Sequence, residues 1–417
     1  MPILERVKTS VRRVGTGVRD VQARHRQRHR PTGFAFALFD RIGMVRPDHW
    51  DSLVAGHSVC LSRAFLETLE CHAPAPLRPH YALIYRDGTP VAAVSAQSLE
   101  VTAASLPKPH PERPGLDRLT RKSLAGIKDR ILVCGNLLSW GPHGVAFAPG
   151  TNPDELWPAV AEALYRIRRA DKLLGETGLV MVKDLTASQA GAAEALRRFS
   201  YRPFETEPNM VLDLKPAWKT FEDYLKDMKS DYRSGIKKQL RDIDEAGLEV
   251  ARLTSDEVQD HGHAIHALYL QVHDKQKLRL VTLTPEWIPA LAQRFSEDFR
   301  TTVIRPKGGG PLRGFVTTLK DGEGAIGYYI GFDRKAAEHA PLYLRLLYAL
   351  VEDAITLGAA RVSLGRTALQ PKAKLGAKPE PMSCLLRHRI QALNLVVASL
   401  LHALPDPEEA PERNPFK

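Results

Sequence analysis

The sequence predicts a mixed α/β fold built from two related lobes. The order strand, turn, strand, strand, helix, strand occurs twice along the chain at similar lengths. The second copy ends in residues 341–378, which read as an amphipathic helix, a glycine stop, a short strand and a basic loop. We place the lobes at residues 33–215 and 216–400, with a basic arm at 1–31 and a surface tail at 401–417.

The first lobe is predicted from its apolar runs and turn residues. Asp87-Gly88 lies between two short apolar runs and indicates a β-hairpin. A Pro-rich and basic segment at 105–130 indicates a surface loop. We expect helices at 61–71, 154–169 and 188–199, and strands at 81–85, 91–94, 131–145, 179–182 and 210–214.

The second lobe repeats this order. Two strands flank the Gly308–Gly310 turn, a third follows, and then a helix whose apolar residues recur every three or four positions. Pro341 fits the first turn of this helix, and Gly358 fits the position after its end. We expect the strands at 301–304, 315–319, 325–332 and 361–364, and the helix at 341–357.

Composition limits the functional class. The 417 residues can form two cores, and the net charge is +11, of which the arm at 1–31 supplies most with nine Lys/Arg against two acids. Four scattered cysteines without a CxxC pair predict free thiols in a reducing compartment. No signal peptide is recognisable, and the apolar run 393–404 is too short for a membrane span. We therefore expect a cytoplasmic protein.

The N-terminal arm combines a valine stripe with arginines. The valines recur at alternating four- and three-residue steps from Val7 to Val21, and a run of Arg and His follows at 24–30. Such a segment suits peripheral contact with an anionic membrane, at its inner face, or with RNA. A solvated basic tail would give the same pattern.

The segment between the lobes carries a second basic face. Ile236, Leu240 and Ile243 form the apolar stripe of a helix. Its opposite face carries cations that suit a phosphate group, although a solvated surface would look the same. These cations are Arg233, Lys237, Lys238 and Arg241.

Residues 213–250, DLKPAWKTFEDYLKDMKSDYRSGIKKQLRDIDEAGLEV, resemble the segment between the lobes of the Fem-type peptidoglycan aminoacyltransferases. Residues 328–365 resemble the end of their second lobe, and also the acetyltransferase domain of cellulose-biosynthesis and capsule N-acyltransferases. The resemblance covers residues ~80–385 and implies tandem lobes of the GNAT (acyl-CoA N-acyltransferase) superfamily. It implies no metal and no tightly bound cofactor, with acyl-CoA or aminoacyl-tRNA as co-substrate.

One departure from the GNAT pattern concerns the donor. GNAT lobes that bind acyl-CoA carry a glycine-containing loop before the central helix, where backbone amides hold the pyrophosphate. Here Asp333–Pro341 contains no glycine. Standard CoA binding is therefore in question, and Fem-type enzymes, which use aminoacyl-tRNA, also lack the loop.

Acyl transfer to an amine needs a group that stabilises the oxyanion, a base, and a cation for the donor's phosphates. Lys372 matches the lysine that the resemblance places after the Gly365-Arg366-Thr367 turn. Tyr328 and Tyr329 alternate along a strand, so one is expected to face the cleft as a proton donor, while strand packing is the simpler reading. Arg366, Thr367 and Lys374 are candidates for phosphate binding, and Asp333 is the nearest candidate base.

The sequence thus predicts an N-acyltransferase that moves an acyl or aminoacyl group to an amine of a small molecule or cell-envelope precursor, such as one of peptidoglycan. The alternative is a non-catalytic GNAT-like protein that binds membrane or RNA through its arm. Both leave the donor, the acceptor and the oligomeric state open.

Overall fold

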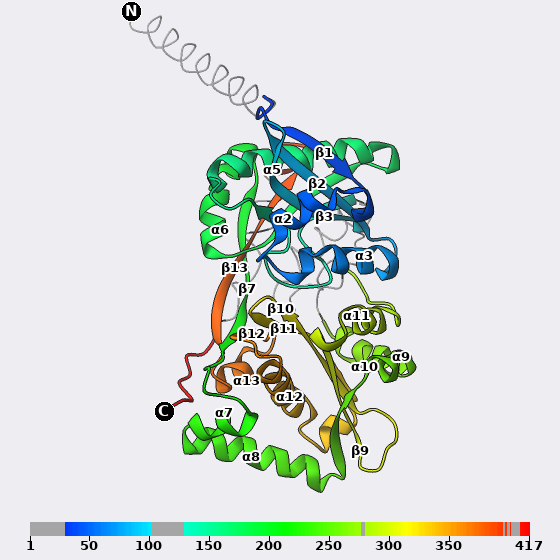
Figure 1. Ribbon diagram of the computed structural model, residues 1–417, viewed down its shortest axis with the longest axis vertical. Coiled ribbons are helices and arrows are strands. Elements are labelled where there is room, and N and C mark those ends of the chain that lie inside the picture. The colour runs from blue at the N-terminus through cyan, green and yellow to red at the C-terminus, as the bar shows by residue number, and fades with distance from the viewer. Residues whose placement is uncertain (1–29, 102–128, 277–279, 395–396, 398–400, 402–408) are drawn as a thin grey trace, which may run out of the picture.

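The computed structural model describes residues 30–101, 129–276, 280–394, 397, 401 and 409–417. The predicted valine-stripe helix and almost all of the predicted loop at 105–130 lie outside these residues. Figure 1 shows two lobes stacked along the long axis of the molecule.

The first lobe contains six strands and its own layer of helices. Asp87 and Gly88 both have positive φ, 50° and 80°, as a two-residue type I′ hairpin requires, so the predicted hairpin is present. The elements are β1 (Ala35–Phe39), α2 (Pro47–Val54), α3 (Arg63–His72), β2 (Arg78–Arg86), β3 (Thr89–Val101), β4 (Asp129–Cys134), β5 (Val145–Phe147), α5 (Pro153–Ala170), β6 (Thr177–Leu185) and α6 (Ala187–Ala192).

The second lobe repeats this connectivity. Strand β7 (Arg202–Asp213) joins the lobes. After it come α7 (Phe221–Asp227), α8 (Ser230–Glu245), β8 (Leu248–Leu253), α9 (Ser255–Asp260), α10 (Gly262–His273), α11 (Trp287–Phe295), β9 (Phe299–Pro306), β10 (Gly314–Asp321), β11 (Gly324–Phe332), α12 (Leu342–Thr356), β12 (Arg361–Ser363), α13 (Leu369–Lys374) and β13 (Lys378–His388).

Two sequence predictions of local structure were wrong. The strand predicted over 131–145 ends at Cys134, because Gly135 and Gly141 adopt positive φ and Pro142 lacks an amide hydrogen. The chain then forms the loop 135–144, and β5 pairs with β3 instead. The basic loop predicted after Gly365 is in fact α13, and the long strand β13 follows it.

All strands belong to one sheet in which the lobes exchange their last strands. The order is β1-β2-β3-β4-β6-β13-β7-β12-β11-β10-β9-β8, with β5 beside β3. β7 leaves the first lobe and pairs with β12 of the second, while β13 returns to pair with β6 of the first. In Figure 1 these two long strands run side by side between the lobes, and their mutual pairing joins the sheet. The mixed α/β class is confirmed, whereas the boundary near residue 215 stays a prediction.

The helices α5 and α12 hold equivalent places in the two lobes. Each links two parallel strands, β4 to β6 and β11 to β12, and each buries an apolar stripe on the sheet. A further core joins the lobes, where Phe65 of α3 packs edge-to-face on Trp287 of α11 with ring centres 5.9 Å apart. The two lobes therefore share buried apolar surface in addition to backbone pairing.

None of the described helices combines the length and the hydropathy that crossing a membrane requires.

Candidate active site between the lobes

The parallel strands of the second lobe separate after three residue pairs. β12 pairs with β11 only from Arg361–Gly324 to Ser363–Ile326, whereas β11 continues to Phe332. A cavity of about 540 Å³ lies where they part, lined by the free half of β11 and by the residues that follow β12. Its volume is typical of small-molecule sites, which measure ~300–1,000 Å³.

The first lobe closes one side of this cavity through the loop 135–144. Ser139 and Trp140 of this loop line the cavity together with Lys183 at the end of β6. The Trp140 indole Nε1 donates a hydrogen bond of 3.0 Å to Ser363 Oγ. The cavity is therefore formed by both lobes, and a change in their relative position would alter it.

Both candidate tyrosines line the cavity. The Tyr329 hydroxyl donates to the carbonyl oxygen of Leu138 over 3.1 Å, and the Tyr328 hydroxyl accepts from the Trp287 indole over 3.3 Å. Burial raises the pKa of both phenols well above the usual range, so both stay protonated at neutral pH. Within the described chain the Tyr328 hydroxyl hydrogen has no acceptor, so this group remains able to donate.

Lys372 lies on α13 and is buried, with 3% of its surface exposed. The helix α13 begins after Ala368, whose positive φ of 55° produces a sharp turn in the chain between β12 and α13. Burial lowers the pKa of Lys372 to about 7, although the carboxylate of Glu207 opposes this change. No ion pair or hydrogen bond of its ammonium group occurs among the described residues, although Lys372 lines the cavity and the Glu207 carboxylate acts on its charge from a longer distance.

Arg366 forms a buried ion pair across the lobes. Its guanidinium contacts the Asp184 carboxylate, which also contacts the Lys183 ammonium and accepts from the Gly141 amide over 3.0 Å. Burial alone would raise the pKa of Asp184, but Lys183 and Arg366 hold it below its usual range. One side of the Arg366 guanidinium therefore holds Asp184, and its predicted role in phosphate binding stays a prediction.

A neutral histidine supports the first-lobe wall. His143 Nδ1 lies 2.7 Å from Ser139 Oγ, and burial, together with the nearby Lys183 ammonium, lowers the pKa of His143 to about 3. The uncharged imidazole can therefore accept the Ser139 hydroxyl hydrogen at neutral pH. This contact fixes Ser139 at the cavity surface.

Thr367 lines the cavity with an exposed side chain, but two other predicted site residues lie elsewhere. Lys374 is exposed on the outer side of α13. Asp333 pairs with Arg313 over 2.8 Å and accepts from the amides of Lys335 and Ala336 at the start of a turn. Burial would raise the pKa of Asp333, but these donors lower it. The prediction of Asp333 as the base is therefore not supported by its position.

The basic face of α8 does not reach the cavity. Figure 1 places α8 at the far end of the second lobe, and its four predicted cations are absent from the cavity lining. Arg233 donates to the carbonyl oxygens of Lys226 and Met228, and Lys237 lies 3.6 Å from Glu222. Lys238 and Arg241 are exposed. This face is a solvated surface with local pairing.

Sequence reasoning missed the first-lobe contribution to the site. The residues concerned are Ser139, Trp140, His143, Lys183 and Asp184. Two signals were available: the Gly- and Pro-rich run GNLLSWGPHG at 135–144, and a Lys-Asp pair directly after an apolar strand. Neither indicates that the segment contacts the other lobe, because that contact depends on how the lobes pack.

Comparison with known proteins supports the fold assignment. Residues 230–373 match the family model of the acetyltransferase (GNAT) domain. The crystal structure of FemX is 10% identical with a TM-score of 0.54, covering 87% of this chain and 99% of FemX. A tandem GNAT protein from the clavulanic acid biosynthesis pathway is 12% identical with a TM-score of 0.50, covering 85% of this chain and 98% of that protein.

A third structure is the C-terminal domain of a putative lysylphosphatidylglycerol synthetase from Agrobacterium fabrum, 11% identical with a TM-score of 0.47, covering 88% of this chain and 98% of that domain. No curated protein matches the chain. Residues 230–373 of the second lobe thus match the GNAT acetyltransferase domain model, and the chain has the tandem GNAT fold, as the sequence predicted.

Proposed function

We propose that the chain is an N-acyltransferase that transfers an acyl or aminoacyl group to an amine in the cavity between the lobes. The observation that carries this proposal is Lys372, a buried ammonium with no direct ion pair or hydrogen bond among the described residues, at the point where β11 and β12 separate. A buried unpaired cation costs folding free energy, so its presence in a cavity indicates an anionic or developing negative partner.

The proposed mechanism assigns roles to the residues that line the cavity. The amine attacks the donor's carbonyl carbon, and negative charge develops on the carbonyl oxygen. The Lys372 ammonium and the Tyr328 hydroxyl stabilise this oxyanion. The tetrahedral intermediate then collapses, the bond from the carbonyl carbon to the donor's leaving atom breaks, and that atom takes up the proton that the attacking amine loses.

We propose aminoacyl-tRNA rather than acyl-CoA as the donor, and two features of the helix N-termini support this choice. The amides of residues 337–340, before α12, bond to backbone carbonyls of the same turn, so they are not free to hold a pyrophosphate. In the first lobe, Asp154 and Glu155 occupy the first turn of α5 and would repel phosphate. Neither of the equivalent helix N-termini therefore suits CoA bound in the usual manner.

The acceptor we propose is the amine of a cell-envelope precursor, following the resemblance of residues 213–250 to Fem-type enzymes. The choice among amines is open to experiment, since the cavity wall is mainly apolar and contains no described carboxylate to select a cationic substrate. Peripheral membrane contact through residues 1–31 would place the protein near such precursors.

The test is a transfer assay with matched donors. The full chain is incubated with a mixture of radiolabelled aminoacyl-tRNAs or with labelled acetyl-CoA, and with amine-bearing envelope precursors. We expect product from aminoacyl-tRNA, and its loss in Lys372→Met but not in Lys374→Met, which removes an exposed lysine from the same helix. Product from acetyl-CoA alone would overturn the choice of donor. No product with either donor, despite binding to anionic vesicles or RNA, would favour the non-catalytic alternative.

A further inference from the structure

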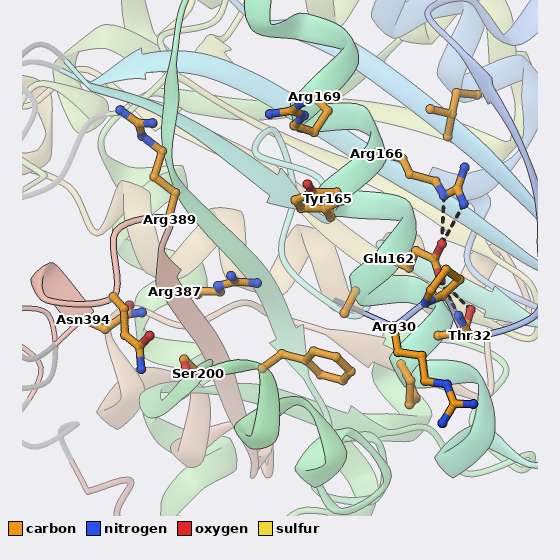
Figure 2. Close-up of a pocket in the computed structure, with 16 residues that line it drawn as sticks. Arg30, Thr32, Glu162, Tyr165, Arg166, Arg169, Ser200, Arg387, Arg389 and Asn394 are labelled. Carbon is orange, nitrogen blue, oxygen red and sulfur yellow. Dashed lines mark hydrogen bonds and ion pairs between the residues drawn. The ribbon is translucent and has the colours of Figure 1, made fainter. Parts of the chain in front are cut away.

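A second hollow, distinct from the cavity between the lobes, lies on the outer side of the first lobe. It has a volume of about 820 Å³ and lies between α5, the end of β13 and the chain before β1. Figure 2 shows the arginines of α5 on one side of it and those of β13 on the other. The two hollows share no lining residue. The arginines that line it, here called the arginine groove, are Arg30, Arg166, Arg169, Arg387 and Arg389.

The arginine groove carries an excess of positive charge. Glu162 is the one carboxylate among its described lining residues, and its oxygens already accept hydrogen bonds from Thr32 and Arg166. Arg169 has no ion pair within the described chain. The Arg387 Nε atom is buried and lacks a hydrogen-bond acceptor in the same residues. Unsatisfied guanidinium hydrogens in a hollow are available to a bound anion.

Aromatic rings fix the orientation of these guanidinium groups. Arg166 lies over the Phe36 ring at 4.6 Å, and Arg387 over the Tyr201 ring at 5.8 Å. In Figure 2 the Arg387 guanidinium is directed toward the face of α5 that carries Tyr165. A planar guanidinium held in place loses less entropy when it binds a phosphate with two parallel hydrogen bonds.

The positive charge extends beyond the groove. A smaller adjoining hollow of about 180 Å³ shares Arg169 and Arg389 and adds Arg168, Lys172 and Glu176, whose carboxylate pairs with Arg389 over 2.6 Å. Burial lowers the pKa of Arg168, and repulsion from Arg387 and Arg389 lowers it further. The like charges therefore raise the free energy of the empty groove, and a bound anion would remove this cost.

We propose that the arginine groove binds a small phosphorylated ligand of about nucleotide size that carries at least two negative charges. The guanidinium groups match phosphate geometry, and a concave site of this volume suits a small molecule better than a duplex or a flat membrane surface. Tyr165, with 40% of its surface exposed, offers an aromatic face on which a ring can stack. This site is separate from the proposed acyl transfer.

Calorimetric titration of the full chain with ADP and with inorganic pyrophosphate, at fixed ionic strength, tests this proposal. We expect a Kd of about 1 mM or lower for both. The double variant Arg169→Gln/Arg387→Gln should raise both values by about tenfold or more. The control Lys238→Gln/Arg241→Gln removes the same charge from the exposed face of α8 and should change them by less than about twofold.

A third variant separates stacking from charge and remains informative if the double variant misfolds. Tyr165→Ala should weaken ADP binding by about fivefold or more and leave pyrophosphate binding nearly unchanged. Three results would overturn the proposal: no binding of either probe, equal weakening by the groove and control variants, or binding restricted to RNA or to vesicles of phosphatidylglycerol.

Discussion

Each lobe contains an equivalent pair of parallel strands, and the two pairs differ in how far their strands stay together. In the first lobe, β4 and β6 pair over five positions up to Cys134 and Val182, and β13 lies on the other side of β6. In the second lobe, β11 and β12 pair over only three positions, and a cavity lies beyond them. In the first lobe the parallel strands stay paired and the outer side is basic. In the second lobe the parallel strands part and a cavity lies beyond them. Equivalent topology therefore does not imply an equivalent site.

This difference explains why the chemistry is assigned to the second lobe and why the first is still required. The first lobe supplies Ser139, Trp140 and Lys183 to the cavity wall, and its β6 provides the edge to which β13 returns. Because β13 follows α13 directly, the position of Lys372 depends on the strand exchange. A single isolated lobe would lack part of the site.

The largest expected effect is on kcat/KM, when one substitution in the cavity between the lobes is compared with one in the arginine groove. Lys372→Met should lower kcat/KM for acyl transfer by about 10²-fold or more, as expected for the loss of one preorganised charged donor. Arg169→Gln in the arginine groove should change kcat/KM by less than about twofold, because it lines the other hollow. Steady-state kinetics of both variants give the comparison, and equal losses would contradict the separation of the two sites.

The pH dependence should reveal the charge state in which Lys372 acts. Its pKa of about 7 means that the ammonium form is lost as pH rises above 7. In Lys372→Arg the charge persists, because guanidinium stays protonated. The ratio of wild-type to variant kcat/KM should therefore fall about tenfold per pH unit above 7, and acceptor ionisation cancels in this ratio. A ratio that rises through pH 7 would instead identify neutral Lys372 as the base.

The contact between lobes should be sensitive to its buried ion pair. Arg366→Ala leaves Asp184 buried with Lys183 as its remaining charged partner, and it should lower the free energy of unfolding by about 3 kcal/mol. Denaturant titration measures this loss. In the double variant Arg366→Ala/Asp184→Asn the loss of unfolding free energy should be smaller, because no buried carboxylate remains without its guanidinium partner. An equal or larger loss would show that the ion pair itself is unimportant for stability.

The smallest expected effect is a gain in stability. Burial lowers the pKa of Lys372 in the folded state below its unfolded value, so the folded state disfavours the charged form. This cost is complete below pH 7 and disappears as pH rises toward about 10.4, the usual lysine pKa. Lys372→Met should therefore raise the free energy of unfolding by about 1–3 kcal/mol at pH 6 and by less at pH 9. Lys374→Met should show no such dependence.

The sequence predicted the fold more completely than the site. The helices now seen as α5 and α12 were evident from their apolar stripes, and the positive-φ hairpin at Asp87-Gly88 from its residue types. The strand β13 was missed, because its first residues Lys378, Pro379 and Glu380 resemble a surface loop and its partners lie in the other lobe. Its role depends on long-range pairing, which local sequence patterns do not encode.

For the site, the sequence identified residues near the strand ends but not their partners. Tyr328, Tyr329, Arg366, Thr367 and Lys372 all line one cavity, while their catalytic and binding roles stay predictions. The burial of Lys372 was not foreseen, because Lys372 and Lys374 look alike in a basic run and differ only in which side of α13 they occupy. Asp333 lies outside the cavity lining and pairs with Arg313, which local sequence could not indicate, and its role as the base stays a prediction.

The most direct test of the central proposal is the reactivity of Lys372 toward acetic anhydride, followed by mass spectrometry from pH 5 to pH 10. Our proposal predicts a reactivity midpoint near pH 7 for Lys372, with the exposed Lys374 of the same helix as the reference residue. It also predicts that aminoacyl-tRNA or an amine acceptor protects Lys372 but not Lys374. Equal reactivity of the two lysines at every pH, or modification of Lys372 that no substrate reduces, would contradict the assignment of this cavity as the site of acyl transfer.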